Sequence, residues 1–552
     1  MFRDLDVKNT ALLAASAMAL SLLLAPMPAA AQHAGHGTHV PAPAKKPAAK
    51  KPAVKKPAAK KPVKKAVAKK AVKKKAAAKK AVATKAPLPA AVEPAHQHVE
   101  PVAPVSPPPA PAPVVDHSAH GGHGAPVPPV PAPTPVVDHS AHVGHGAPAA
   151  EPANPHSGHG SLGGALGPYP MNREASGTAW QPDTSAHSGL TATRGDWTLM
   201  GHGVLSLVYD RQGGQRGDDK LFAAGMLMGM ARRPLGNGTL QLKAMVSPDP
   251  LMGKRGYPLL LASGETADGV EHLVDRQHPH DFFMELSASI SQNIGGKGSV
   301  FLYAGLPGEP AFGPPAFMHR EAIMDSPEAP ISHHWLDSTH IAFGVVTGGV
   351  VLDRVKLEVS RFNGREPDQH RWNIETAPLD STAARLSWNP TDTLSLQGSW
   401  GRFIAPEQLE PEVDQTRWSA SALYAREVAP GWKLAGTLAW GRKSVKHHGE
   451  WRHDDAYVAE ASLKNRSWTW FGRGEMTENR ELVETDGAEE HGPAYRVGKL
   501  SAGAVRDFRL GEHLTFGVGG LVSLNFVPDD LAPEYGGHHP MGAMAFARLK
   551  ID

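Results

Sequence analysis

The feature that most constrains the fold is a strict alternation of apolar and polar residues that recurs through residues 196–552. In 355–360, for example, Val355, Leu357 and Val359 are separated by polar residues. The same pattern occurs in 239–246, 282–292, 393–401 and 543–551. Successive side chains of a β-strand point to opposite faces, so each segment predicts a strand with one apolar and one polar face.

The connections between these segments alternate between short and long. Short connections lie near 235–238, 295–298, 353–354, 389–391, 429–431, 465–466 and 510–511. Longer ones lie at 211–218, 248–280, 307–337, 365–379, 404–414, 445–453, 479–495 and 526–540. Short turns on one side and long loops on the other are typical of outer-membrane barrels, and tryptophans near the strand ends fit the aromatic girdles of that class. We therefore predict an all-β fold, a transmembrane antiparallel β-barrel of about 16 strands over 196–552.

The polar faces of these strands carry charges of both signs. They include Lys243, Glu285, Lys356, Glu358, Arg385, Glu460, Lys464, Arg473 and Glu475. An Arg or Lys on the lipid face would cost about 2–4 kcal/mol at the bilayer midplane. The polar faces are therefore predicted to line a water-accessible lumen, with the apolar faces against outer-membrane lipid.

The residues before the barrel divide into three parts. Residues 1–31 resemble a secretory signal peptide, with an apolar run from Ala11 and small residues Ala29-Ala30-Ala31 before Gln32. Residues 32–170 form a long low-complexity tail that is predicted to be disordered, and 171–195 form a linker. Export predicts the outer membrane of a Gram-negative-type envelope, with the tail in the periplasm.

The first half of the tail is strongly basic. From Lys45 to Lys85 it contains 18 lysines and no acidic residue. Basic runs bind polyanions, and the export signal excludes nucleic acid as the natural partner. Anionic peptidoglycan or lipopolysaccharide is the predicted partner, and a solvated spacer is the alternative.

A histidine-rich unit occurs twice in the tail, at 114–124 and again 22 residues later. It supplies His117, His120, His123, His139, His142 and His145. Imidazoles suit Cu(II) and Zn, so this repeat predicts a metal-binding tail with one of these ions as cofactor. A pH-responsive tail and a repeat without a role are the alternatives.

Further histidines fall in the two longest predicted loops. They are His278 and His280 in the first, and His319, His333, His334 and His340 in or beside the second. Asp275, Asp281 and Asp337 lie beside them in sequence and are predicted to orient their rings, and Met318 and Met324 are candidate thioether ligands. These residues predict a second metal site. The alternative is that they pin the loops inside the barrel as a constriction.

The order of signal peptide, histidine-rich tail and barrel resembles the copper-resistance protein B family of the outer membrane. The resemblance is carried by segments 116–123 and 138–145. That family's tail is rich in Met as well as His, whereas residues 32–170 contain no Met. The loss of thioethers shifts the expected ion from Cu(I) toward Cu(II) or Zn. The last strand ends in Ile551-Asp552, where outer-membrane barrels typically end in an aromatic residue.

Two functions follow from these features. The first is an outer-membrane barrel that binds or handles transition-metal ions, with the tail as a metal buffer. The alternative is a general or solute-selective porin that its basic tail tethers to the cell wall. The chain contains no G-x-S-x-G element or comparable nucleophile motif, so no enzymatic activity is predicted.

Overall fold

The computed structural model describes residues 163–186, 189–447, 449–483 and 492–551, and every structural statement below refers to them. The tail, the signal sequence and the tail histidines predicted to bind metal lie outside this part of the chain. Within it, no helix has the length and apolar character needed to cross a bilayer.

A closed antiparallel ring of strands forms the wall. Its sheet contains 17 strands, of which β1 (Leu190–Arg194) is a short addition, so the ring itself has sixteen. The ring strands are β2 (Trp197–Gln212), β3 (Asp219–Leu235), β4 (Gly238–Val246), β7 (Phe283–Ile294), β8 (Gly298–Gly305), β9 (Val345–Leu352), β10 (Val355–Phe362), β11 (Ser381–Thr391), β12 (Leu394–Phe403), β13 (Gln415–Ala429), β14 (Trp432–His447), β15 (Glu450–Asn465), β16 (Trp468–Asn479), β17 (Tyr495–Arg509), β18 (Leu514–Phe526) and β19 (Met541–Ile551).

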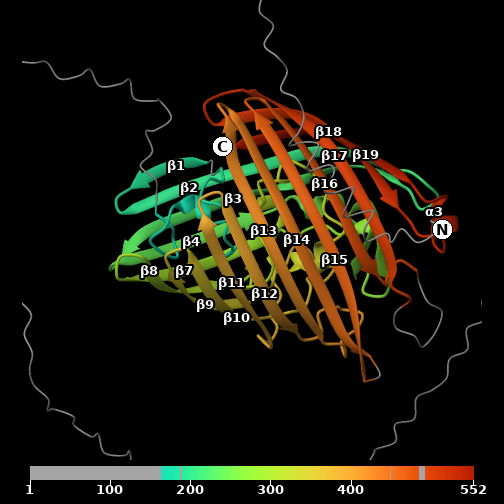
Figure 1. Ribbon diagram of the computed structural model, residues 1–552, viewed down its shortest axis with the longest axis horizontal. Helices are drawn as coiled ribbons and strands as arrows, with labels where there is room; N and C mark the ends of the chain where they lie inside the picture. Colours follow the sequence, from blue (N-terminus) through green and yellow to red (C-terminus); the bar gives the residue numbers. More distant parts are fainter. Residues whose placement is uncertain (1–162, 187–188, 448, 484–491, 552) are drawn as a thin grey trace, which may run out of the picture. The chain divides into compact units, whose positions relative to one another are not determined.

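Closure comes from the pairing of the last strand with the first. Each ring strand pairs with the next along the chain, and β19 pairs with β2 in register from Gly542↔Gln212 to Ile551↔Gly203. Figure 1 shows this junction, where the red β19 lies along the green β2. Strand β1 pairs with the first residues of β2, beyond the end of β19. The predicted barrel of about 16 strands is confirmed.

The wall has its apolar side outward. Along β10, Val355, Leu357 and Val359 are exposed, whereas Lys356 and Glu358 are buried. The polar faces predicted from the alternation therefore point into the lumen. An exposed apolar belt around a buried charged interior is the arrangement that a bilayer requires.

The ring has a short-turn end and a long-loop end, as predicted, with one correction. The expected long loop at 445–453 is wrong, because β14 and β15 continue through most of that range. Their pairing extends to Val445↔Arg452 and Lys446↔Trp451. The stretch is polar and contains Gly449, so its composition alone favours a loop.

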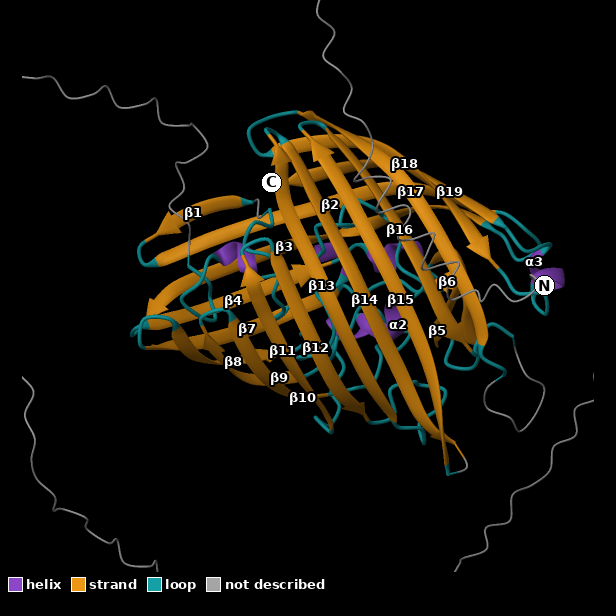
Figure 2. Ribbon diagram, viewed as in Figure 1, coloured by secondary structure: helices purple, strands orange, loops and turns teal. Residues whose placement is uncertain are grey.

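The two longest loops fold back inside the ring. The loop from β4 to β7 contains helix η2 (Asp249–Met252) and a two-stranded hairpin of β5 (Tyr257–Thr266) and β6 (His272–Gln277). The loop from β8 to β9 contains the short helices η3 (Phe317–His319), α2 (His333–Leu336) and η4 (Ser338–His340). Figure 2 shows these helices within the ring of strands. Apolar hairpin residues such as Leu259 and Leu261 pack with inward wall residues such as Phe471 and Val505.

The segment 163–186 also lies inside the ring, at the short-turn end, and includes helix η1 (Met171–Arg173). The sequence places this stretch in the tail and linker because it lacks strand alternation. Its backbone oxygens instead accept hydrogen bonds from inward wall side chains, namely Ser291, Ser299, Arg232, Lys356 and Asn389. The remaining described helix is α3 (Ala532–Tyr535), in the loop before β19.

Candidate functional site

Five of the six predicted loop histidines come together in the lumen. His278 and His280 follow β6, His333 and His334 lie on α2, and His340 ends η4. Their ring centroids are 5.1 Å apart for His280–His340 and His333–His340, and 5.7 Å apart for His333–His334. His278 lies 5.9 Å from His334 and 6.3 Å from His333. We call these five residues the histidine cluster.

Asp337 is the residue that arranges the second-loop part of this cluster. It is the single residue between α2 and η4, so it is in reach of histidines on both helices. The Nδ1–H of His333 donates to its carboxylate at 2.9 Å, and the Nδ1–H of His340 donates to its main-chain oxygen at 2.8 Å. The Arg320 guanidinium donates a 2.5 Å hydrogen bond to the other carboxylate oxygen of Asp337. It also donates hydrogen bonds to Glu460 on the wall.

The first-loop histidines have carboxylate partners that sequence proximity did not predict. His280 Nδ1 lies 2.8 Å from Asp249, and His278 Nε2 lies 3.0 Å from Glu265. Asp249 and Glu265 take the positions expected for Asp281 and Asp275. Asp281 instead pairs with Arg371, and Asp275 accepts from the Tyr535 hydroxyl and pairs with Arg216. Partners across a folded hairpin cannot be read from spacing along the chain.

Burial sets the charge of most of the cluster. It lowers the pKa of His278 to about 4, against the opposing effect of Glu265. It also lowers the pKa of His333, and holds that of His340 well below its ordinary value. His334 is the exception, because the adjacent Glu366 carboxylate outweighs burial and raises its pKa to about 9. The neutral imidazole is the form that binds metal ions.

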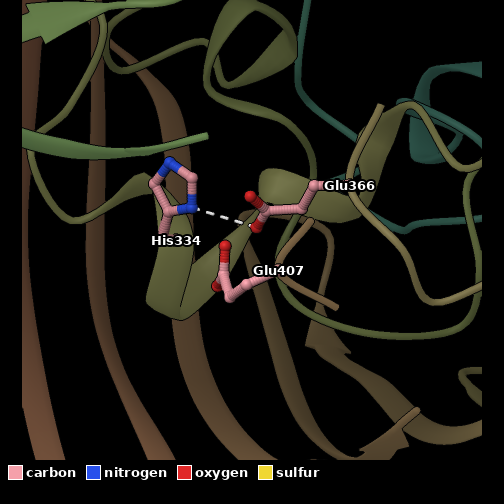
Figure 3. Close-up of side chains that lie close together, drawn as sticks. All are labelled: His334, Glu366 and Glu407. Carbon is pink, nitrogen blue, oxygen red and sulfur yellow. Dashed lines mark hydrogen bonds and ion pairs between the residues drawn. The ribbon is translucent and has the colours of Figure 1, made fainter. Parts of the chain in front are cut away.

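His334 has two further neighbours that the sequence analysis missed. Its Nδ1 lies 3.0 Å from Glu366, and Glu407 lies beside both (Figure 3). Among the described residues, this is the set of three His and acidic side chains whose ligand atoms all lie within 4.8 Å of one another. Burial raises the pKa of Glu407 to about 8. Arg417 lies 3.9 Å from Glu366 and 3.7 Å from Glu407, so a cation already faces this set.

His319, the sixth predicted loop histidine, lies apart from the cluster. It lines a cavity of about 130 Å³ toward the short-turn end, together with Met226, Met318 and Met324. A second cavity of about 90 Å³ shares these methionines with the first and reaches His278 and His280. A third, of about 390 Å³, is lined by Pro279 and Arg371 together with exposed loop residues such as Lys254 and Trp372. The segment 278–280 therefore borders two cavities, because His278 and His280 line the second and Pro279 lines the third.

Methionines are unusually concentrated around the inner cavities. Met200, Met226, Met228, Met230 and Met245 are inward wall residues that pack together. Met171, Met284 and Met318 join them from the interior segment, β7 and η3. Unbranched thioether side chains fill irregular gaps, and they are also soft ligands for metal ions.

No family model matches the sequence, and no curated protein matches it, so the resemblance to copper-resistance protein B stays a prediction. Similar solved structures are outer-membrane proteins at low identity. Pseudomonas putida OprB is 9% identical with a TM-score of 0.44, covering 64% of this chain and 94% of that one. Salmonella typhi OmpF in complex with daunomycin is 11% identical with a TM-score of 0.40, covering 66% and 100%. An anion-selective porin from Comamonas acidovorans is 13% identical with a TM-score of 0.38, covering 64% and 100%.

Proposed function

We propose that this chain forms a narrow outer-membrane channel for small hydrophilic solutes, the porin alternative of the sequence analysis. The observation that carries the proposal is the series of cavities within a charged lumen. Two adjoining cavities run from the short-turn end to His278 and His280, and the third is lined by the intervening Pro279 and by exposed loop residues. The inward loops make this path far narrower than the full width of a ring of sixteen strands.

The charges along the path support small ions as well as neutral solutes. The cavity at the short-turn end is lined by Lys433, Lys464 and Lys550, but also by Glu321 and Asp325. A lining of both signs favours hydrated polar solutes over apolar ones. No part of this function requires a reacting group.

Planar-bilayer conductance of the full chain tests this proposal. We expect discrete openings that are small for a barrel of this size, because the interior loops occupy much of the lumen. Met226→Phe should reduce the conductance, since Met226 lines both inner cavities. Met230→Phe is a matched control, because Met230 is another buried inward methionine of β3 and lines none of the three cavities described above.

Two results decide the matter. A folded barrel, recognised by its heat-modifiable migration on a gel, that never conducts would overturn the channel proposal. Equal conductance in the Met226 and Met230 variants would show that ions do not follow the inner cavities.

The tail belongs to the same proposal as a periplasmic tether, in which the lysines from Lys45 to Lys85 bind anionic peptidoglycan or lipopolysaccharide. Co-sedimentation of the full chain with peptidoglycan sacculi tests that part.

A further inference from the structure

Three members of the histidine cluster share one hydrogen-bonding pattern. His280, His333 and His340 each place Nδ1 within 2.8–2.9 Å of an oxygen, supplied by Asp249, by the Asp337 carboxylate and by the Asp337 main chain. Metal-binding histidines almost always donate one ring N–H to a carboxylate or carbonyl oxygen, which fixes the ring and directs the other nitrogen at the ion. The pattern leaves Nε2 as the ligand atom of all three rings.

Within the described part of the chain, two of the three Nε2 atoms are buried without a partner. The Nε2 atoms of His280 and His340 are inaccessible to solvent and have no hydrogen-bond partner among the described residues. Buried polar atoms of a folded protein normally have a partner, and each exception calls for an explanation. Two such atoms lie in one cluster, on rings that hydrogen bonds at Nδ1 already hold in place. They indicate that a metal ion binds to these nitrogens.

For two of the three ring pairs, the spacing of the ring centroids matches metal coordination. A Zn–N bond of about 2.0 Å places the ring centroid roughly 3.2 Å from the ion, so two imidazoles at a tetrahedral angle have centroids roughly 5.2 Å apart. His340 lies 5.1 Å from both His280 and His333. The ligand atoms of the three rings are not all within 4.8 Å of one another, so binding must draw the rings together.

We infer that His280, His333 and His340 bind a divalent late first-row transition-metal ion inside the barrel. Imidazole nitrogen suits Zn(II), Cu(II) and Ni(II). The cavity lined by Met226, Met318 and Met324 ends at His280, so an ion that enters from the short-turn end meets soft thioethers before the imidazoles. Binding does not depend on conduction, so a barrel that never conducts would overturn the channel proposal and leave this one standing.

The neighbouring set of His334, Glu366 and Glu407 is the competing location. It is more compact in the structure, and Figure 3 shows its three side chains converging. However, the Arg417 guanidinium lies beside both carboxylates, and Glu366 already accepts a hydrogen bond from His334. A metal ion there would have to replace the proton between His334 and Glu366 and would lie next to Arg417. In the described part of the chain, no Lys or Arg forms such a contact with the imidazoles of His280, His333 and His340.

Zinc binding by the full chain in detergent tests the inference. Equilibrium dialysis at micromolar free Zn²⁺ should show one fewer ion per chain in His333→Gln/His340→Gln than in the wild type. The tail histidines are present in both proteins, so their contribution cancels. His538→Gln/His539→Gln is the matched control, since this pair lies in the loop before β19 outside the cluster. Its effect on the number of ions bound in the lumen should be nil. Glu407→Gln should also leave the count unchanged.

The same stoichiometry in His333→Gln/His340→Gln and in the wild type would overturn the inference. Loss of an ion only in Glu407→Gln would also overturn it, because the site would then lie at the competing set. If the double variant fails to fold, anomalous scattering at the zinc edge from wild-type crystals soaked in ZnCl₂ decides. A peak between His280, His333 and His340 is expected, and its absence from a map with peaks elsewhere would reject the site.

Discussion

Among single residues, Arg320 joins the interior to the wall. Its side chain is 1% exposed and forms 2.7 Å bonds to both Glu460 oxygens on β15, as well as the bond to Asp337. Loss of one partner from a buried ionic network leaves uncompensated charge, whereas exposed pairs contribute little. The positions of His333 and His340 therefore depend on a residue that contacts neither ring.

Arg320→Met should lower the free energy of unfolding by about 3–5 kcal/mol, because Asp337 and Glu460 would both remain buried without their cation. Arg402→Met is the control, since Arg402 forms an exposed pair with Asp414 and should cost less than about 1 kcal/mol. Guanidinium unfolding in detergent, followed by circular dichroism, measures both values. Similar losses in the two variants would contradict the assigned role of Arg320.

Glu309 should make stability depend on pH. Burial raises its pKa to about 7, against the opposing effects of Arg385 and Ser176, and Glu285 and Lys243 also face it. The folded state then holds a proton that the unfolded state releases above its ordinary pKa of 4.5. The stabilisation is complete below that value and is lost as the pH rises through 7.

The thermal midpoint of the wild type should therefore fall between pH 5 and pH 8 by more than that of Glu309→Gln, which cannot ionise. Thermal scans of both proteins at several pH values measure the difference. Asp353→Asn serves as control, because Asp353 is exposed and should leave the pH dependence as it is in the wild type. Parallel pH curves for wild type and Glu309→Gln would refute the assignment.

At the scale of elements, the segment 163–186 is a plug held mainly by side chains. Arg232, Lys356 and Arg385 of the wall bond to it, and its own backbone forms turns and isolated bridges but no strand. It contributes no strand to the ring. The ring hydrogen bonds therefore do not depend on it.

Deletion of 163–186 should leave a folded barrel whose single-channel conductance is several-fold higher, because the short-turn end of the lumen would be cleared. The freed wall cations would face water instead of a buried partner. Deletion of 88–111, which is equally long and lies in the tail, controls for shortening of the chain. Conductance that is unchanged by the first deletion would show that this segment does not restrict the path.

Alternation predicts the wall well because successive side chains of each wall strand face lipid and lumen in turn. Strands such as β4 and β10 agree closely with the segments 239–246 and 355–360. The interior follows no such period. The β5–β6 hairpin and the segment 163–186 are fixed by tertiary contacts, so the sequence presented them as loop and linker.

The candidate site was predictable in its residue types but not in its pairing. The sequence singled out His280 and His333, yet nothing along the chain shows that these two residues, with 52 residues between them, both pack against the ring of His340. Asp249 and Glu366 were missed because they lie in other parts of the loops. Only the pairing of loops across the lumen makes them neighbours.

At the scale of the whole molecule, the wall carries apolar side chains outside and polar side chains inside. This arrangement determines how much a charged substitution on the outer face destabilises the protein. Val359 lies midway along β10 and is 49% exposed, whereas Leu514 begins β18 at the short-turn end and is 39% exposed. Both side chains point outward, but a bilayer would surround them differently. The cost of an outward Arg falls from about 2–4 kcal/mol at the midplane to about 0–1 kcal/mol near the interface.

Val359→Arg should therefore destabilise the barrel by about 2–4 kcal/mol in phospholipid vesicles, and Leu514→Arg by no more than about 1 kcal/mol. Reversible guanidinium unfolding from vesicles measures both. In water-filled surroundings the two substitutions would cost similar amounts, because neither residue packs inside the lumen. Equal losses would thus mean that this face does not lie in lipid, whereas the expected gradient would place the centre of β10 near the middle of the bilayer and the start of β18 at its surface.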